Sequence, residues 1–77
     1  MNTAILLMDV RHHFTAAERA RRTGGTYDAS EGSAAAKAIS AAMRNMLAAG
    51  LTHAQALGAL RDLAGDVVRT VRQEMEG

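Results

Sequence analysis

The stretch from Thr52 to Met75 carries the longest clean helical repeat of apolar residues in the chain. Gln55 follows Thr52 by three residues, a capping-box pattern in which each side chain accepts a hydrogen bond from the other residue's backbone N–H. At about 1.5 Å per residue, such a helix is roughly 35 Å long, which is long for a chain of 77 residues. We therefore expect the other segments to fold against its apolar face.

The apolar face of this helix is found by placing successive residues about 100° apart around the axis. Its members are Leu57, Leu60, Leu63, Ala64, Val67, Val68, Val71 and Met75. Charged residues such as Asp62, Asp66 and Arg69 fall on the opposite side. We predict that the whole apolar face belongs to the core.

A second helix is predicted over residues 33–49, with Ser30 as an alternative start. A large apolar stripe with helical spacing is made by Ala36, Ile39, Met43, Met46 and Leu47. Only Gly50 and Leu51 separate it from Thr52, and a glycine just past a helix end accepts the left-handed backbone conformation. A connection this short predicts that the two helices form an antiparallel hairpin.

Residues 3–22 have two interpretations. As one helix, this segment places its apolar residues on one face: Leu6, Leu7, Val10, Phe14 and Ala17. As a strand, the run from Ala4 to Val10 would lie buried in a sheet, and a helix capped by Thr15 would follow. We favour the helix, because no second stretch looks like a strand and a lone strand leaves its backbone groups unpaired.

Residues 23–32 read TGGTYDASEG and interrupt the helical pattern. Paired glycines have high backbone freedom, and Thr, Asp and Ser side chains compete for local backbone hydrogen bonds. We therefore predict a flexible loop between the first and second helices.

The chain is short, has no cysteine and contains one Phe and one Tyr. Its length and apolar content indicate a single helical domain over residues 1–77, with a thin core that disulfide bonds cannot reinforce. Dimerisation is the expected remaining source of stability. We assign self-association to residues that point away from the predicted core: Ile5, Ala34, Ala38 and Ala41.

No catalytic or metal-binding pattern stands out. His12 and His13 are adjacent, so on a helix their rings point about 100° apart, and His53 lies on another helix. Asp62 and Asp66 lie one turn apart on a polar helix face, without the nucleophile and base that covalent catalysis needs. We predict no enzyme activity, no bound metal and no cofactor.

Arginines gather towards the end of the first predicted helix. Met8, Arg11, His12, Arg19 and Arg22 fall on one outer side of it, and we call these residues the arginine patch. The planar donor fork of arginine suits phosphate and carboxylate groups alike, so the patch is the candidate partner-binding surface. The alternative is a helix end whose arginines only complement the helix dipole.

These observations predict a small all-α bundle with a long C-terminal helix in an antiparallel hairpin, its core completed by dimerisation. The expected function is that of a non-enzymatic binding protein that regulates or inhibits a protein partner. The alternative is a dimeric nucleic-acid-binding regulator that uses the arginine patch, although a net charge of +1 and the scarcity of aromatic residues count against it. The apolar run over residues 4–8 is too short for a membrane span or a signal peptide, so we expect a cytoplasmic protein without a membrane partner.

Overall fold

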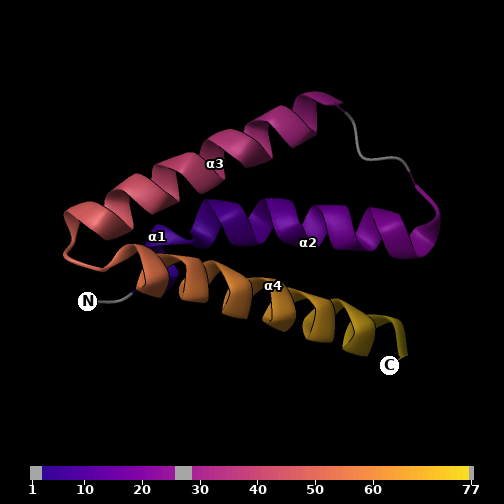
Figure 1. The fold of residues 1–77 in the computed structure, drawn as a ribbon. Coiled ribbons are helices and arrows are strands. Elements are labelled where there is room, and N and C mark those ends of the chain that lie inside the picture. The colour runs from indigo at the N-terminus through magenta and orange to yellow at the C-terminus, as the bar shows by residue number, and fades with distance from the viewer. Residues whose placement is uncertain (1–2, 26–28, 77) are drawn as a thin grey trace.

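The computed structural model describes residues 3–25 and 29–76. Within these ranges the chain forms four helices and no strand: α1 (Thr3–Leu6), α2 (Met8–Thr23), α3 (Ala29–Ala48) and α4 (His53–Glu76). In Figure 1, α2 lies between α3 and α4, and α2 and α4 run in the same direction while α3 runs back. The predicted all-α bundle is confirmed, and residues 4–10 are helical rather than extended apart from the turn at Leu7.

The first helical segment is interrupted at Leu7, where the sequence predicted one helix over residues 3–22. The Leu7 N–H is shared between the carbonyl oxygens of Thr3 and Ala4, at N–O distances of 3.1 and 3.3 Å. The Leu7 carbonyl then accepts a hydrogen bond from the Arg11 N–H at 2.8 Å, in the first turn of α2. The turn leaves the Leu7 side chain buried in the core.

The start of α3 differs from the expected residue 33. The helix begins at Ala29, so Gly32 is already helical and the connection after α2 is shorter than the predicted loop over residues 23–32. Gly24 ends α2 in the left-handed conformation, with φ +74°. Residues 26–28 lie outside the described part of the chain, and the flexibility of this loop stays a prediction.

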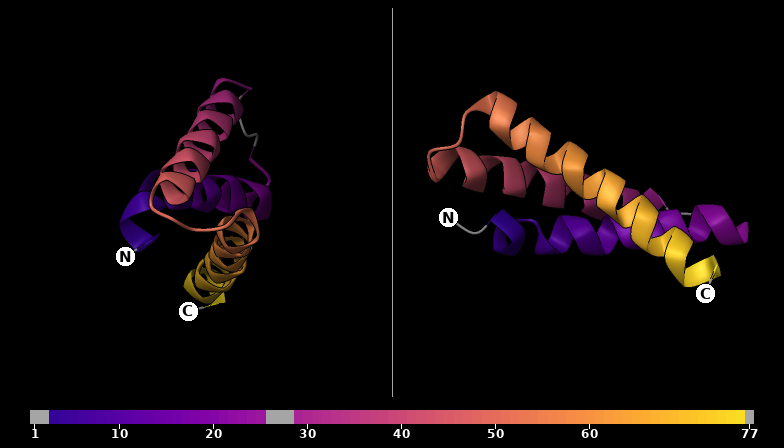
Figure 2. Two further views of the ribbon diagram at one scale, coloured as in Figure 1. Left: turned by 60° about the vertical axis from the view of Figure 1, so that its left-hand side comes forward. Right: turned by 90° about the horizontal axis from the view of Figure 1, so that it is seen from below.

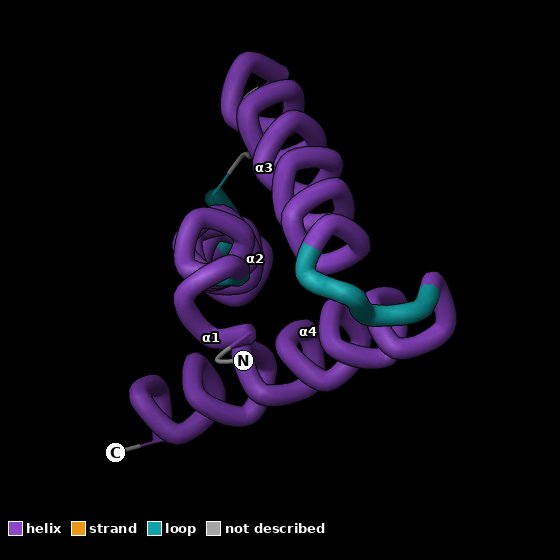
Figure 3. Tube along the Cα trace, turned by 90° about the vertical axis from the view of Figure 1, so that its left-hand side faces the viewer, coloured by secondary structure: helices purple, strands orange, loops and turns teal. Residues whose placement is uncertain are grey.

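The joint between α3 and α4 has the local structure that the sequence predicted. Gly50 has φ +102°, in the region that favours glycine. The capping box is formed in both directions: the Thr52 N–H donates to Gln55 Oε1 at 2.8 Å, and the Gln55 N–H donates to Thr52 Oγ1 at 3.1 Å. From this joint α3 and α4 diverge as an open hairpin, so that each of them packs along α2 (Figure 3).

The core lies where α2 meets the other helices. Its buried residues are all apolar: Leu7, Val10, Ala42, Met46, Ala56, Leu63, Val67 and Val71. Phe14, Ile39, Met43 and Leu60 pack around them as half-buried neighbours. Among residues 3–25 and 31–76 no polar side chain is buried, so hydrophobic burial is the main stabilising term of this core.

The prediction that the whole apolar face of the last helix is buried was wrong. The side chains of Leu57 and Met75 are 50% and 46% exposed, and Ala64 is also exposed. The face is too wide for one neighbour to cover, and α4 crosses α2 obliquely (Figure 2). Only the half of the face that is turned towards α2 and α3 is buried.

Candidate protein-binding surface

Two ion pairs join α2 to α4 along their length. Arg11 Nη1 lies 2.8 Å from Asp66 Oδ2, and Arg19 Nη2 lies 2.9 Å from Glu74 Oε1. In both pairs the partners are 55 residues apart in the sequence. The constant separation shows that the two helices run in the same direction in one register. The Arg11 guanidinium also lowers the pKa of the Asp66 carboxyl by hydrogen bonding to it.

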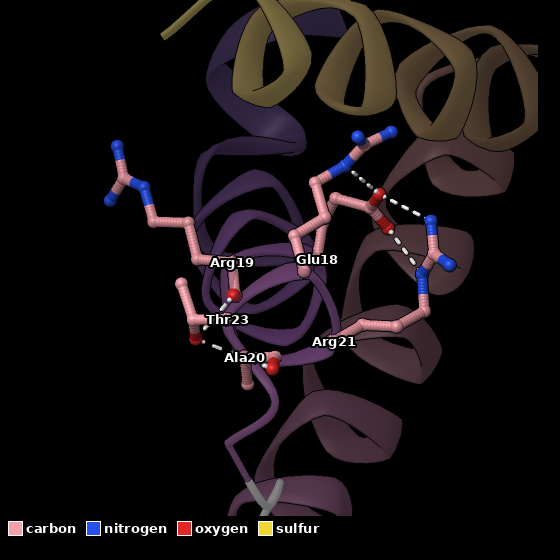
Figure 4. A network of polar contacts seen from close by, with 6 residues as sticks. Glu18, Arg19, Ala20, Arg21 and Thr23 are labelled. Carbon is pink, nitrogen blue, oxygen red and sulfur yellow. Dashed lines mark hydrogen bonds and ion pairs between the residues drawn. The ribbon is translucent and has the colours of Figure 1, made fainter. Parts of the chain in front are cut away.

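A second cluster of charges lies near the end of α2. The Glu18 carboxylate accepts hydrogen bonds from Arg21 Nη2 and Arg22 Nε, both at 2.7 Å. These bonds stabilise its charged form and lower the pKa of Glu18 to about 2. Figure 4 shows Arg19 pointing away from this cluster, in keeping with its partner Glu74 on α4.

The structure thus places the arginine patch in a different setting from the one expected. Met8 is 64% exposed and His12 is exposed, as predicted for an outer face. Each arginine of the patch, however, is paired with a carboxylate: Arg11 with Asp66, Arg19 with Glu74, and Arg22 with Glu18. Its guanidinium groups therefore act within the fold, and two of them hold α2 against α4.

The residues assigned to self-association do not form one surface. Ile5 is 65% exposed on α1, which lies beside the end of α3 (Figure 1). Ala34 is exposed near the start of α3, far along that helix from α1. Ala38 packs against the core and Ala41 is half-buried. Ala38 is therefore part of the monomer core rather than of an outer stripe, and dimerisation stays a prediction.

A continuous apolar surface lies instead on α4. Leu57, Ala64, Val68 and Met75 follow one another at intervals of seven, four and seven residues, and we call them the α4 strip. Three of them directly follow a buried residue of the core, so the strip is the core stripe turned by about 100°. Sequence periodicity merged the two stripes into one wide face. The sequence signal that separates the two stripes is that each stripe forms a complete helical repeat of its own.

Beside the α4 strip is a hollow of about 250 Å³ between α2 and α4. It is lined by apolar side chains and by one ion pair at its edge: Phe14, Ala17, Ala64, Val67 and Val68, with Glu18 and Arg21. Val68 belongs both to the hollow and to the strip. The two features therefore form one apolar surface that reaches from α4 onto α2.

The described residues offer little for chemistry. No three His, Asp or Glu side chains in these ranges lie close enough together to hold a metal ion. The rings of His12 and His13 meet edge to face with centroids 5.5 Å apart, and His53 lies in the first turn of α4. None of the helices in the described ranges has an apolar run long enough to cross a lipid bilayer.

Comparisons with protein-family models, with curated proteins and with solved structures find no match to this chain. The molecule is defined by its own geometry as a small all-α bundle in which α2 packs between two diverging helices and an apolar strip of α4 is left exposed.

Proposed function

We propose that the chain is a non-enzymatic binding protein that regulates or inhibits a protein partner, and that it contacts this partner through the α4 strip and the adjoining hollow. The observation that carries the proposal is the exposure of Leu57 and Met75 at the two ends of a helical stripe of apolar residues. A contiguous apolar surface of this kind marks an interaction site more often than single exposed apolar residues do.

The spacing of the α4 strip supports a helical partner. Intervals of seven and four residues are those of a seam between two packed helices. The hollow next to Val68 is lined from two helices, and so could take one side chain of a helix laid along the strip. This is the arrangement by which an amphipathic helix docks in an apolar groove.

The arginine patch gives less support as a binding surface, because its arginines are already paired with carboxylates. The nucleic-acid alternative depended on the same arginines, so we do not propose it. Ile5 and Met8 are more exposed than the ends of the strip, and they provide a comparison of similar size and chemistry for the test.

The test compares two double variants as bait in a lysate of cells that express the chain naturally. Leu57→Gln with Met75→Gln removes the ends of the strip, whereas Ile5→Gln with Met8→Gln removes two equally large apolar side chains elsewhere. We expect a set of proteins that the wild type and the second variant retain and the first variant loses. Equal retention by both variants would contradict the proposal, as would turnover of a small molecule that is lost on changing one polar residue.

A further inference from the structure

The positive charges of the chain divide into two groups. Five of the nine basic side chains form ion pairs: Arg11, Arg19, Arg21, Arg22 and Arg69. The other four are exposed and have no carboxylate partner among the described residues: Lys37, Arg44, Arg61 and Arg72. All the arginines of α2 belong to the first group, so the unpaired positive charge lies on α3 and α4.

Two of the unpaired arginines border the α4 strip. Arg61 follows Leu57 by four residues and Arg72 follows Val68 by four residues, so each lies one helical turn from a member of the strip on the same flank. On this flank the nearest carboxylate is Glu76, which lies beyond Met75 in the last turn of α4, whereas Glu74 is paired with Arg19. Along most of its length this flank of the strip therefore carries positive charge.

The other two unpaired basic residues lie on α3. Lys37 and Arg44 lie two helical turns apart and line a hollow of about 260 Å³, together with Ser33, Ala36 and Ser40. This hollow is on the flank of α3 next to Leu47, which Arg44 precedes by three residues. The two helices that diverge from the Gly50 joint thus both carry basic residues that the fold itself does not neutralise.

A second copy of the chain does not suit this surface. Two α4 strips packed antiparallel around a twofold axis would bring the same flank of each helix together. Arg61 of one copy would then face Arg72 of the other, and like charges in such a pair destabilise it. An acidic partner would turn the same two arginines into favourable contacts.

A lipid surface or a nucleic acid suits the surface less well than a helix does. A flat bilayer would not fill a hollow between two helices, and Phe14 and Ala17 lie on its α2 side. The charged phosphate backbone of a nucleic acid would make no hydrophobic contact with the apolar strip. A helix satisfies both features, because its side chains pack as knobs into holes formed by several residues of its neighbours.

From this arrangement we infer that the α4 strip binds an amphipathic helix whose apolar face is flanked by Asp or Glu side chains, with Arg61 and Arg72 as the charged contacts. The inference rests on the proposed function and names the chemistry of the partner. From Leu57 to Met75 the strip is about 27 Å long, which corresponds to a partner helix of about five turns.

The test uses two synthetic peptides of that length as probes. Both carry Leu at the spacing of the strip, and the flanking positions are Glu in one peptide and Lys in the other. Binding to the whole chain is measured by fluorescence anisotropy of a label on the peptide. We expect the Glu peptide to bind at least about tenfold more tightly at low salt.

The protein variants are matched in charge. Arg61→Gln with Arg72→Gln should abolish the preference for the Glu peptide, whereas Lys37→Gln with Arg44→Gln, which removes two positive charges of α3 that form no ion pair among the described residues, should keep it. Circular dichroism of each variant checks that the helices are intact. An equal loss of preference in both variants would show a general charge effect and would overturn the inference.

The remaining outcomes separate the inference from the proposed function. Equal binding of both peptides, lost in Leu57→Gln with Met75→Gln, would overturn the acidic preference and keep the proposed function. Binding of neither peptide would overturn the inference, and binding to vesicles of anionic phospholipid instead would identify a membrane surface as the ligand. If the wild type is a dimer and Leu57→Gln with Met75→Gln converts it to a monomer, a second copy of the chain occupies the strip.

Discussion

Arg19 on α2 and Glu74 on α4 are joined by a forked contact, with Nη2 at 2.9 Å from Oε1 and Nε at 3.1 Å from Oε2. Glu74 follows the buried Val71 by three residues and Val67 by seven. It therefore lies on the core stripe of α4, at the point where the apolar residues of that stripe end. At this position the contact between α2 and α4 is the ion pair of Arg19 with Glu74, in place of a further apolar contact.

Glu74→Gln should lower the melting temperature slightly, by less than a core substitution does, because the pair is exposed to solvent. The decrease should shrink as salt is added, since salt screens exposed charges. Thermal unfolding followed by circular dichroism measures both effects. Glu76→Gln is the control, because it removes a carboxylate that forms no ion pair with the described residues; an equal decrease in both variants would contradict the role of the Arg19 contact.

The stability of the fold should depend on pH through Glu18. Its pKa is about 2 in the folded chain, because Arg21 and Arg22 hold its carboxylate, against an ordinary value of 4.5. Between these two values the unfolded chain binds more protons than the folded chain. The contribution of Glu18 is thus complete above pH 4.5 and is lost as the pH falls towards 2.

Urea unfolding at a series of pH values measures this contribution. Glu18→Gln should flatten the profile between pH 4.5 and about 2, while the part due to Asp66, whose pKa is also lowered, should remain. Carboxyl carbon NMR of the wild type should show Glu18 titrating near the lower value. A midpoint near 4.5 would contradict the ion pairs at Glu18.

Two leucines of α4 should respond differently to the same change. Leu63 is 5% exposed and Leu57 is 50% exposed. Leu63→Ala should lower the free energy of unfolding by about 2–5 kcal/mol, whereas Leu57→Ala should change it by no more than about 0.5 kcal/mol. Chemical denaturation measures both. A large loss at Leu57 that grows with protein concentration would show that self-association buries the strip.

Replacing each of two glycines by alanine should change the stability of the chain in opposite directions. Gly50 has φ +102°, so Gly50→Ala should destabilise the chain by about 1–2 kcal/mol. Gly58 lies inside α4, and a Cβ there would meet no atom within 4 Å; Gly58→Ala should therefore stabilise the chain by up to about 1 kcal/mol. Since Gly50 also has open space around its Cβ position, equal effects at the two sites would contradict the backbone explanation.

The candidate surface could be predicted from the sequence only in part. The members of the α4 strip were recognised as apolar and helical, but they were placed in the core together with Leu63 and Val67. Helical periodicity identifies a face and its width, and it does not say how much of that face a neighbour will cover. Arg61 and Arg72 had no distinguishing signal, because being unpaired is a property of what surrounds them in space.

The sequence by itself determined that the chain is helical and what forms the joint between the last two helices. The capping box of Thr52 and Gln55 and the left-handed Gly50 depend on residues next to one another in the chain, so local chemistry is enough to predict them. Only the tertiary structure decided that α2 packs between α3 and α4, that Arg11 and Arg19 pair with carboxylates 55 residues away, and that the α4 strip stays exposed. These features depend on which helix faces meet in three dimensions. Because α2 and α3 bury only one apolar stripe of α4, the adjoining stripe stays exposed to solvent.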